Sequence, residues 1–389
     1  MKRLIAAAVG VCVCVSQMAA GAAEEAKKPA GDPIKIGAIF AVTGPASFLG
    51  VPEGRTAQLF VDKFNEAGGL LGRPVQLVIK DSAGDSAKAV SIAKQLIEEE
   101  KVLAIIGPST SGETMGIKDL CETEKMLLLS CAAAETIVNP VAKYVFKTPR
   151  KDSQAVVWIY KTMKDKGISK IAVLSGNDGF GKAGKKQLET MAAEHGITIV
   201  ANEVYDVKAA DFSDIVTKVK AASPEAVVNW TVAPAQSIVA KNMRQLGLTI
   251  PLFCSHGFGN RKYAEQAGLA AEGILFPAGR LLVVDSLLAD HPQKAVLSSY
   301  KKDYETKFAG EDVSTFGGHA YDALLIITKA VEKANSTDRA AVREALETLK
   351  GVVGTAGVFN FSAEDHNGLG LDAFEMLTVK DGKFVLYKK

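Results

Sequence analysis

The feature that most constrains the fold of this chain is a regular alternation of short apolar segments with amphipathic ones. The first apolar segments are β-branched or leucine-rich, are bounded by Gly, Pro or Asp, and lie at 34–42, 75–79, 102–106 and 126–130. Helical patterns separate them at 53–66, 86–99 and 112–122. Continuous apolar strands that alternate with amphipathic helices predict a parallel sheet covered on both faces. This part of the chain therefore predicts one α/β lobe.

The same alternation begins again after residues 144–150. Expected strands follow at 170–174, 198–204, 226–231, 251–254 and 273–276. Expected helices lie at 152–166, 182–194, 212–222 and 234–246. A second α/β lobe is therefore predicted. Two doubly wound lobes that face each other form a cleft at the carboxyl ends of their strands, where this architecture binds ligands.

The last part of the chain departs from this alternation. Three long helical patterns, at 293–308, 315–333 and 338–350, precede two strand-like segments at 357–361 and 374–387. Within the second segment, Asp381 and Gly382 stand between alternating apolar residues, which predicts a β-hairpin. Because three helices need a sheet to cover, we expect the chain to return to the first lobe and to finish on the second.

The predicted fold class is therefore α/β, with two doubly wound parallel-sheet lobes and a ligand cleft between them. We expect residues 34–150 and 279–357 to form lobe 1. Residues 151–278 and 358–389 are expected to form lobe 2.

The N-terminus predicts export. Lys2 and Arg3 precede an apolar run at 4–15, which is followed by small residues at 20–22. A basic start, a short apolar run and an Ala-x-Ala pattern are typical of a cleaved secretory signal peptide, here residues 1–22. The run has about twelve residues, whereas a membrane span needs about 20. A polar linker at 23–33 leads into the first lobe.

Charge and cysteine content argue against other classes of protein. Lys and Arg number 46 against 44 Asp and Glu, and loss of Lys2 and Arg3 makes the charges even. A balanced chain has no electrostatic footprint for nucleic acid. Cys121, Cys131 and Cys254 are odd in number and fit no zinc spacing. A Cys121–Cys131 disulfide stays open, because the sequence does not establish that the two side chains meet.

Motifs for catalysis are incomplete. The string GNDGFGKA at 176–183 nearly matches the phosphate loop G-x-x-x-x-G-K-[ST], but Ala183 replaces the hydroxyl residue that holds magnesium. We interpret it as a Gly-rich turn that starts a helix. No two of the five histidines have metal-ligand spacing, and there is no G-x-S-x-G nucleophile motif. We expect no enzyme activity, no catalytic residue, no metal site and no cofactor.

Several short motifs follow one another in a fixed order. They are IGA at 36–38, TGP at 43–45, NEAGGLLGRPV at 65–75, the segment 81–85, IGPSTS at 106–111, DGFG at 178–181 and DFS at 211–213. From about Ile34 to the C-terminus, this series resembles the leucine/isoleucine/valine-binding family of ABC-transporter receptors, with the type I periplasmic-binding-protein fold. The resemblance implies a periplasmic location and a three-segment hinge near Arg150, Ala278 and Val358. It also implies a permease and its ATPase as partners of a binding protein that we expect to be monomeric.

The resemblance also implies where a carboxylate would bind. In amino-acid-binding relatives, a serine after the third strand and backbone groups after the fourth hold the carboxylate of the ligand. Ser111 and Ala132 occupy these positions. Hydroxyl and N–H groups at helix N-termini favour negative charge, and Ser111 is itself expected to be a helix N-cap. We therefore predict a site for a small carboxylate.

The side that would hold an ammonium group differs from these relatives. They place a hydroxyl residue, a tyrosine and a carboxylate where an ungapped alignment puts Ala134, Val232 and His256. A buried ammonium group would lack partners there, whereas His256 supplies a cation or a neutral hydrogen-bond donor. We therefore expect a carboxylate ligand without an α-amino group.

Aromatic residues suggest that this acid is aromatic or branched aliphatic. Phe180 lies where relatives have an aromatic lid, and four more rings lie in or beside cleft loops: Phe48, Trp230, Phe258 and Phe316. Such rings form flat apolar walls, although each is also compatible with core packing.

Three alternative functions stay open. One is leucine, isoleucine or valine binding for amino-acid transport, and a second is periplasmic ligand sensing. The third is an exported hydrolase, for which a nucleophile and base are missing.

Overall fold

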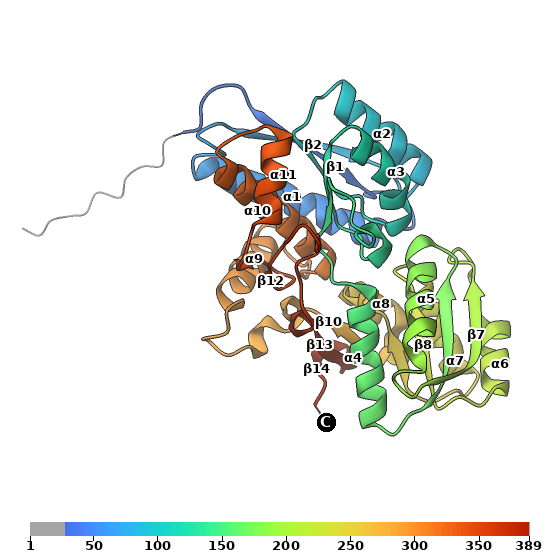
Figure 1. The fold of residues 1–389 in the computed structure, drawn as a ribbon. Helices are drawn as coiled ribbons and strands as arrows, with labels where there is room; N and C mark the ends of the chain where they lie inside the picture. Colours follow the sequence, from blue (N-terminus) through green and yellow to red (C-terminus); the bar gives the residue numbers. More distant parts are fainter. Residues whose placement is uncertain (1–27, 389) are drawn as a thin grey trace, which may run out of the picture.

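A computed structural model describes residues 28–388. The expected signal peptide and the first part of the linker lie outside these residues. Figure 1 shows two α/β lobes, one built on the blue-to-teal part of the chain and one on the green-to-yellow part. No helix of the described chain is long and apolar enough to cross a membrane. The predicted fold class is thus confirmed.

The first lobe is built on a parallel sheet of five strands in the order β2-β1-β3-β4-β5. The strands are β1 (Ile34–Phe40), β2 (Val75–Asp81), β3 (Ala104–Ile106), β4 (Leu127–Ser130) and β5 (Val145–Lys147). The helices from the same part of the chain are α1 (Ser47–Glu66), α2 (Ser86–Glu98) and α3 (Ser111–Thr123), with a short η1 (Glu135–Ile137). Three helices return from the C-terminal part: α9 (Lys294–Lys307), α10 (Thr315–Ala334) and α11 (Arg339–Glu347).

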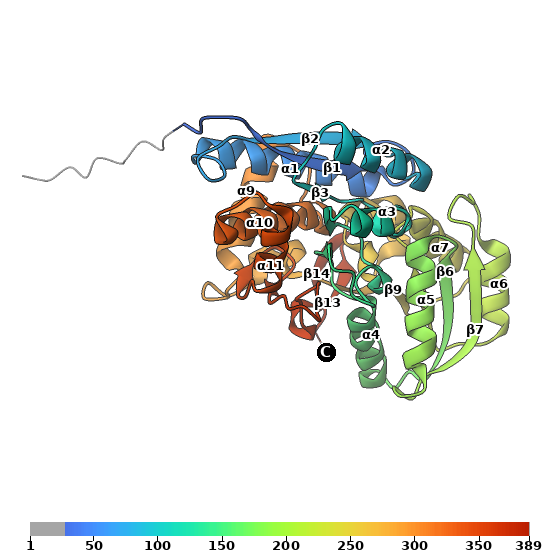
Figure 2. The same ribbon diagram turned by 45° about the horizontal axis from the view of Figure 1, so that its top comes forward.

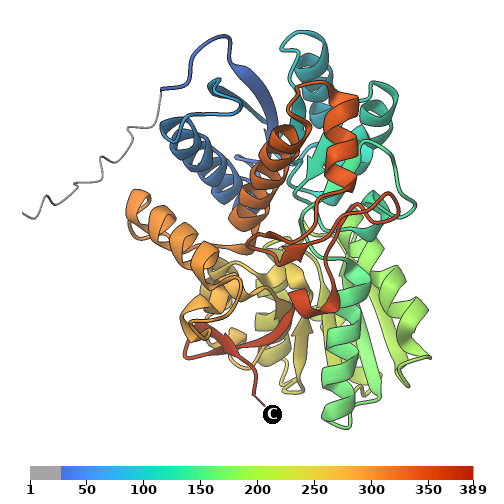
Figure 3. The same cartoon turned by 60° about the vertical axis from the view of Figure 1, so that its left-hand side comes forward.

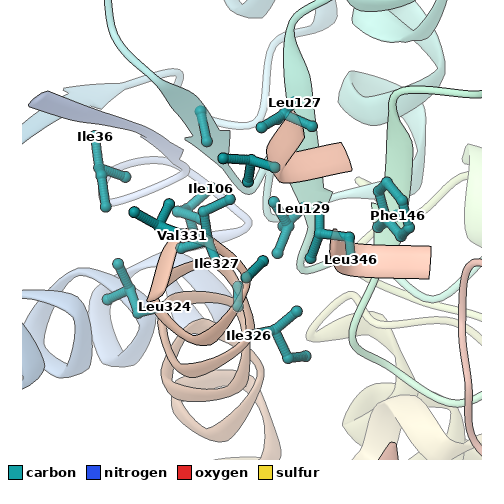
Figure 4. Close-up of a cluster of buried hydrophobic side chains, with 14 of the residues drawn as sticks. Ile36, Ile106, Leu127, Leu129, Phe146, Leu324, Ile326, Ile327, Val331 and Leu346 are labelled. Carbon is teal, nitrogen blue, oxygen red and sulfur yellow. The ribbon is translucent and has the colours of Figure 1, made fainter. Parts of the chain in front are cut away.

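The core of this lobe shows why the chain returns. Ile36, Ile106 and Leu129 of the sheet lie in one cluster with Leu324 and Ile327 of α10, and all five side chains are fully buried (Figure 4). Helix α1 covers part of this face with Ala57 and Val61, and without α10 the rest would be exposed to water. Full burial of one such side chain is favourable by roughly 1.5–3 kcal/mol, which explains the long apolar run in α10.

The second lobe is built on seven strands in the order β14-β13-β10-β9-β8-β6-β7. They are β6 (Lys170–Gly176), β7 (Thr198–Tyr205), β8 (Ala226–Trp230), β9 (Leu252–Cys254), β10 (Leu275–Ala278), β13 (Glu375–Lys380) and β14 (Lys383–Leu386). Its helices are α4 (Asp152–Asp165), α5 (Gly179–Ala192), α6 (Ser213–Ala221), α7 (Ala235–Gln245) and α8 (Arg261–Ala267), with the short helices η2 (His256–Phe258) and η3 (Gly268–Ala271). The hairpin predicted at Asp381 and Gly382 joins β13 to β14, and it pairs antiparallel with β10.

Alternating residues of β6 divide this lobe into two apolar layers. Ile171 and Val173 belong to a cluster with residues of α4 and α5, whereas Ala172 and Leu174 belong to another with residues of α6, α7 and α8. Successive side chains of a strand point to opposite faces, so each face has its own helices. The sheet is therefore covered on both sides, as its continuous apolar strands predict.

The chain crosses between the lobes in three segments, and the third differs from expectation. The first passes Arg150, between β5 and α4. The second passes Gly279 into η4 (Arg280–Ser286), and the short strands β11 (Val352–Val353) and β12 (Val358–Phe359) follow α11. We expected the third crossing near Val358. Phe359 and Phe361 are instead buried in the core of lobe 1.

The chain leaves that core through η5 (Leu371–Ala373) and enters the second sheet at Glu375. Figure 3 shows this red segment running from α11 to the terminal hairpin. Burial of the two phenyl rings, which sequence spacing does not reveal, moves the crossing.

Helix α1 begins earlier than predicted. The expected start was residue 53, just after Pro52, but the helix begins at Ser47 and contains Pro52. Gly50 lies against the backbone of Ala41, where a Cβ atom would come within 2.2 Å of the Ala41 carbonyl. Close packing of this first turn against the end of β1 outweighs the tendency of proline to mark a helix boundary.

Candidate functional site

A small, partly open cavity lies between the lobes, at the carboxyl ends of the strands. The space open to the centres of water molecules is about 20 Å³, so the cavity holds only one or two of them. Lobe 1 contributes the residues Leu49, Ser109, Thr110, Ser111, Cys131, Ala132, Ala133, Pro149, Phe316 and His319. Lobe 2 contributes Phe180, Val232, His256 and Gly257. We call this space the inner cavity.

A larger outer chamber of about 410 Å³ adjoins it. The two spaces share Leu49, Thr110, Ser111, Phe180 and Val232 in their walls. The other walls of the outer chamber come from loops of both lobes, and apolar residues such as Pro45, Ala46, Val207 and Ala233 are among them. A ligand group in the inner cavity could therefore be continuous with an apolar group in the outer chamber.

The structure brings together six of the ten predicted site residues. These line the inner cavity: Ser111, Ala132, Phe180, Val232, His256 and Phe316. The other four lie elsewhere. Ala134 is buried behind Ser111, and Trp230 is fully buried beneath His256. Phe258 packs in the lobe 2 core against Phe276, and Phe48 packs against Tyr263.

Ser111 and Ala132 lie where the sequence predicts that the ligand's carboxylate binds. Both already make hydrogen bonds within the protein. The N-cap of α3 is Thr110, whose hydroxyl forms a capping box with Glu113, so Ser111 is the first helical residue and not the cap we expected. The Ser111 hydroxyl accepts a hydrogen bond of 3.2 Å from the Ala134 N–H. The Ala132 N–H already donates to the Ser130 hydroxyl at 3.1 Å.

Two helix N-termini meet beside this end of the cavity. A Cβ atom on Gly179, the first residue of α5, would lie 3.0 Å from the Gly112 nitrogen and 3.1 Å from its Cα, in α3. Figures 1 and 2 show α3 and α5 next to each other, one from each lobe. The first amides of a helix have no acceptor within it and carry partial positive charge. The N-terminus of α3 therefore favours a negatively charged group in the cleft, whereas that of α5 is already capped by the carboxylate of Asp178.

His256 forms the opposite wall and is a neutral ring. It is surrounded edge-to-face by Phe180, Trp230 and Phe374, with ring centroids 5.2–5.7 Å away. Burial, and then the positive charges of Lys147 and Arg150, hold the pKa of His256 well below its usual range. Of the two states that the sequence left open, the structure thus favours the neutral hydrogen-bonding ring over the cation.

A second histidine, His319 of α10, lines the same cavity and was missed by the sequence analysis. Burial and the charge of Arg150 also hold its pKa well below the usual range. A signal was available, since His319 lies one helical turn after Phe316 and three-residue spacing puts both on one helix face. His319 was tested only for metal-ligand spacing, because ligand-binding positions were expected just after strands and His319 lies within a helix.

Buried charges lie beneath the cavity and are used by the protein itself. Lys147 donates hydrogen bonds to the carbonyls of Ala133 and Arg150, and Asp152 accepts one of 3.0 Å from the Glu135 N–H. Burial lowers the pKa of Lys147 and raises that of Asp152, and the charge of each opposes the other's shift. These contacts tie the loop after β4 to the start of α4.

The residues considered for enzyme chemistry have structural contacts. Asp178 caps α5, and its carboxylate accepts a hydrogen bond of 2.8 Å from the Gly181 N–H, so GNDGFGKA is the helix-starting turn we expected. Cys121 and Cys131 are both free and buried, which answers the open disulfide question. Within residues 28–388, no group of three or more His, Cys, Asp or Glu could hold a metal ion.

Two doubly wound lobes with a ligand-sized space between them define a two-lobed solute-binding protein. Comparison with known proteins supports this class of protein. A family model described as "Periplasmic binding protein" matches residues 33–383. The chain therefore belongs to the periplasmic binding protein family.

Individual relatives have low sequence identity to this chain. The chain is 27% identical to "Leu/Ile/Val-binding protein homolog 3" of Brucella melitensis, over 90% of this chain and 93% of that protein. It is 28% identical to the "Leucine-, isoleucine-, valine-, threonine-, and alanine-binding protein" of Pseudomonas aeruginosa, over 82% and 83% of the two chains. The crystal structure of an extracellular ligand-binding receptor from Rhodopseudomonas palustris HaA2 matches with a TM-score of 0.86 and 26% identity, covering 92% of this chain and all of that one.

Proposed function

We propose that this protein is the periplasmic solute-binding component of an ABC importer of the branched-chain amino acid type. It binds a small carboxylate that lacks an α-amino group, with an aromatic or branched aliphatic body, when its two lobes close. A permease and its ATPase subunits are its proposed partners, and the signal peptide at 1–22 its route of export. The names of the relatives support the solute-binding role.

The composition of the inner cavity carries the proposal about the ligand. Among the residues that line it, in the described part of the chain, none is a Lys, Arg, Asp or Glu. The N-terminus of α3 and the Ser111 hydroxyl suit a carboxylate. An ammonium group would find the neutral ring of His256 and the aliphatic Val232, and burying a charge without a partner is strongly unfavourable.

A conventional amino acid is the second candidate, because both named relatives are described as binding proteins for leucine, isoleucine and valine or as homologues of them. A ligand screen separates the two candidates. In thermal-shift and calorimetric titrations of the purified mature protein, aromatic and branched aliphatic acids should bind, whereas leucine, isoleucine and valine should not. Tight binding of leucine would reject the proposal about the missing amino group.

Replacement of Ser111 with alanine should weaken carboxylate binding by about 1.5–3 kcal/mol, the usual range for a hydrogen bond to a charged group. The measurement is isothermal titration with the best acid from the screen. Ser213→Ala is a matched control, because Ser213 is also the first residue of a helix, α6, but lies outside both cavity walls. Equal affinities of Ser111→Ala and the wild type would remove Ser111 from the site.

A further inference from the structure

Two histidines, one from each lobe, face the inner cavity together. His256 belongs to η2 of lobe 2 and His319 to α10 of lobe 1, and both line the cavity wall. Their side chains are almost fully buried, with 9% and 7% of each residue exposed. A ligand held between them would contact both lobes at once.

Their ring nitrogens lack partners within the described protein. Neither Nδ1 nor Nε2 of His256 makes a hydrogen bond with residues 28–388, and neither does Nδ1 of His319. The nearest carboxylate oxygen, Oδ1 of Asp152, is 3.7 Å from Nε2 of His256 and also lacks a hydrogen bond in this part of the chain. Buried polar atoms are normally hydrogen-bonded, so these nitrogens indicate a place where a ligand atom binds.

The charges around the two rings indicate what kind of atom this is. Lys147 and Arg150 lie behind the rings, and both donate to backbone carbonyls of the protein. Among the described residues, the cavity wall offers no free cation to a second anionic group and no carboxylate to a cationic one, since Asp152 lies behind His256 and not in the wall. A neutral imidazole offers one N–H donor and one bare nitrogen acceptor. This combination suits an uncharged oxygen, either a keto oxygen or a hydroxyl group.

The size of the inner cavity fixes where this oxygen lies in the ligand. Ser111 and both histidines line a space of only about 20 Å³. A carboxylate near Ser111 and an oxygen near the histidines are therefore close together, which fits groups on adjacent carbons. The rest of the molecule can pass Phe180 and Val232 into the outer chamber, whose wall is mostly apolar but also contains Asp85, Asp178 and Lys208.

We infer that His256 and His319 bind the α-oxygen of the ligand, and that this protein selects α-keto or α-hydroxy acids over acids without that oxygen. The inference rests on the proposed function, since it assumes a carboxylate ligand. It adds His319 as a residue that determines specificity and names the class of acid.

The test compares matched acids on matched proteins by isothermal titration. The branched series consists of isocaproate, its α-keto and α-hydroxy derivatives, and leucine. The aromatic series consists of phenylpropionate, phenylpyruvate, phenyllactate and phenylalanine. Wild-type protein should bind an oxygenated acid at least about 10-fold more tightly than the plain acid, because only the oxygen satisfies the buried nitrogens.

His319→Phe and His256→Phe should each reduce that ratio to nearly one, since phenylalanine keeps a ring but has no polar atom. His195→Phe is the control, because His195 packs against Tyr160 away from the cavity and should keep the wild-type ratio. In case a variant does not fold, ¹⁵N chemical shifts of the histidine rings in wild-type protein give a second measurement. The His256 and His319 signals should move more with phenylpyruvate than with phenylpropionate.

The possible outcomes test the inference and the proposed function separately. Plain acids that bind as tightly as oxygenated ones would overturn the inference and leave the proposed function standing. Isobutylmalonate, the α-carboxy analogue of isocaproate, is titrated alongside the branched series, and a preference for it would overturn the inference as well, because the second group would then be charged. Binding of leucine with no binding of any acid would reject the proposed function, and the inference with it. A complete lack of binding in both series would have the same consequence.

Discussion

Replacement of Gly179 with valine is expected to weaken ligand binding by about 10- to 100-fold while leaving each lobe folded. A Cβ atom at this position would press against the Gly112 nitrogen and Cα and lie 3.4 Å from the Ser111 carbonyl carbon. These are backbone atoms, which cannot rotate away. The branched side chain would hold the lobes apart, and closure would then cost part of the binding free energy.

Calorimetry with the preferred acid measures this loss, and small-angle scattering shows whether the ligand still makes the protein more compact. Gly179→Ala should have a smaller effect in the same direction. Gly54→Ala in α1 is the control, because a Cβ atom there would meet its nearest neighbour at 3.8 Å. Wild-type affinity in Gly179→Val would show that α3 and α5 need not touch in the bound form.

Replacement of Arg150 with methionine is expected to lower the free energy of unfolding by about 3 kcal/mol. Arg150 is buried at the first crossing, and its guanidinium group donates to the carbonyls of Ala356 and Ala373 near the third. It also lies 5.0 Å from the centre of the Phe374 ring. Burial lowers its pKa to about 9, so it is still a cation at neutral pH. Methionine keeps the apolar stem but leaves both carbonyls without a donor.

Denaturant unfolding followed by circular dichroism gives this value. The matched control is Arg244→Met, because Arg244 also donates to backbone carbonyls, those of Leu248 and Ile250, but within one lobe and in a partly exposed place. Its loss should be below about 1.5 kcal/mol. Equal losses in the two variants would contradict a special role of Arg150 at the hinge.

The elements of both lobes could be predicted from the sequence, whereas the contacts between the lobes could not. Period and composition decide a strand such as β1 or a hairpin such as β13–β14, because those signals are local. The meeting of Gly112 with Gly179 depends on how two separate domains dock, and neither glycine differs from an ordinary turn residue in the sequence.

The same reason explains which site residues were predicted. Ser111 and Phe180 follow strands, and the architecture places strand ends at the cleft. Trp230 also ends a strand, but its indole fits against Gly184 of α5, where a Cβ atom would come within 2.0 Å of Nε1. That close packing puts the ring beneath the cavity wall. His319 comes from the middle of a helix, and only the return of α10 to lobe 1 brings it to the cavity.

The late return of the chain also determines when the core of each lobe can be completed. Lobe 1 lacks the inner layer of its core until residues 315–334 of α10 are available. Lobe 2 lacks two strands of its sheet until β13 and β14, near residue 386, are available. Neither half can complete its native core while the C-terminal tenth of the chain is missing, because Phe359 and Phe361 of the lobe 1 core and strands β13 and β14 of lobe 2 lie within it. For the export that we propose, completion of both lobes only near the C-terminus suits a chain that crosses a membrane before it folds.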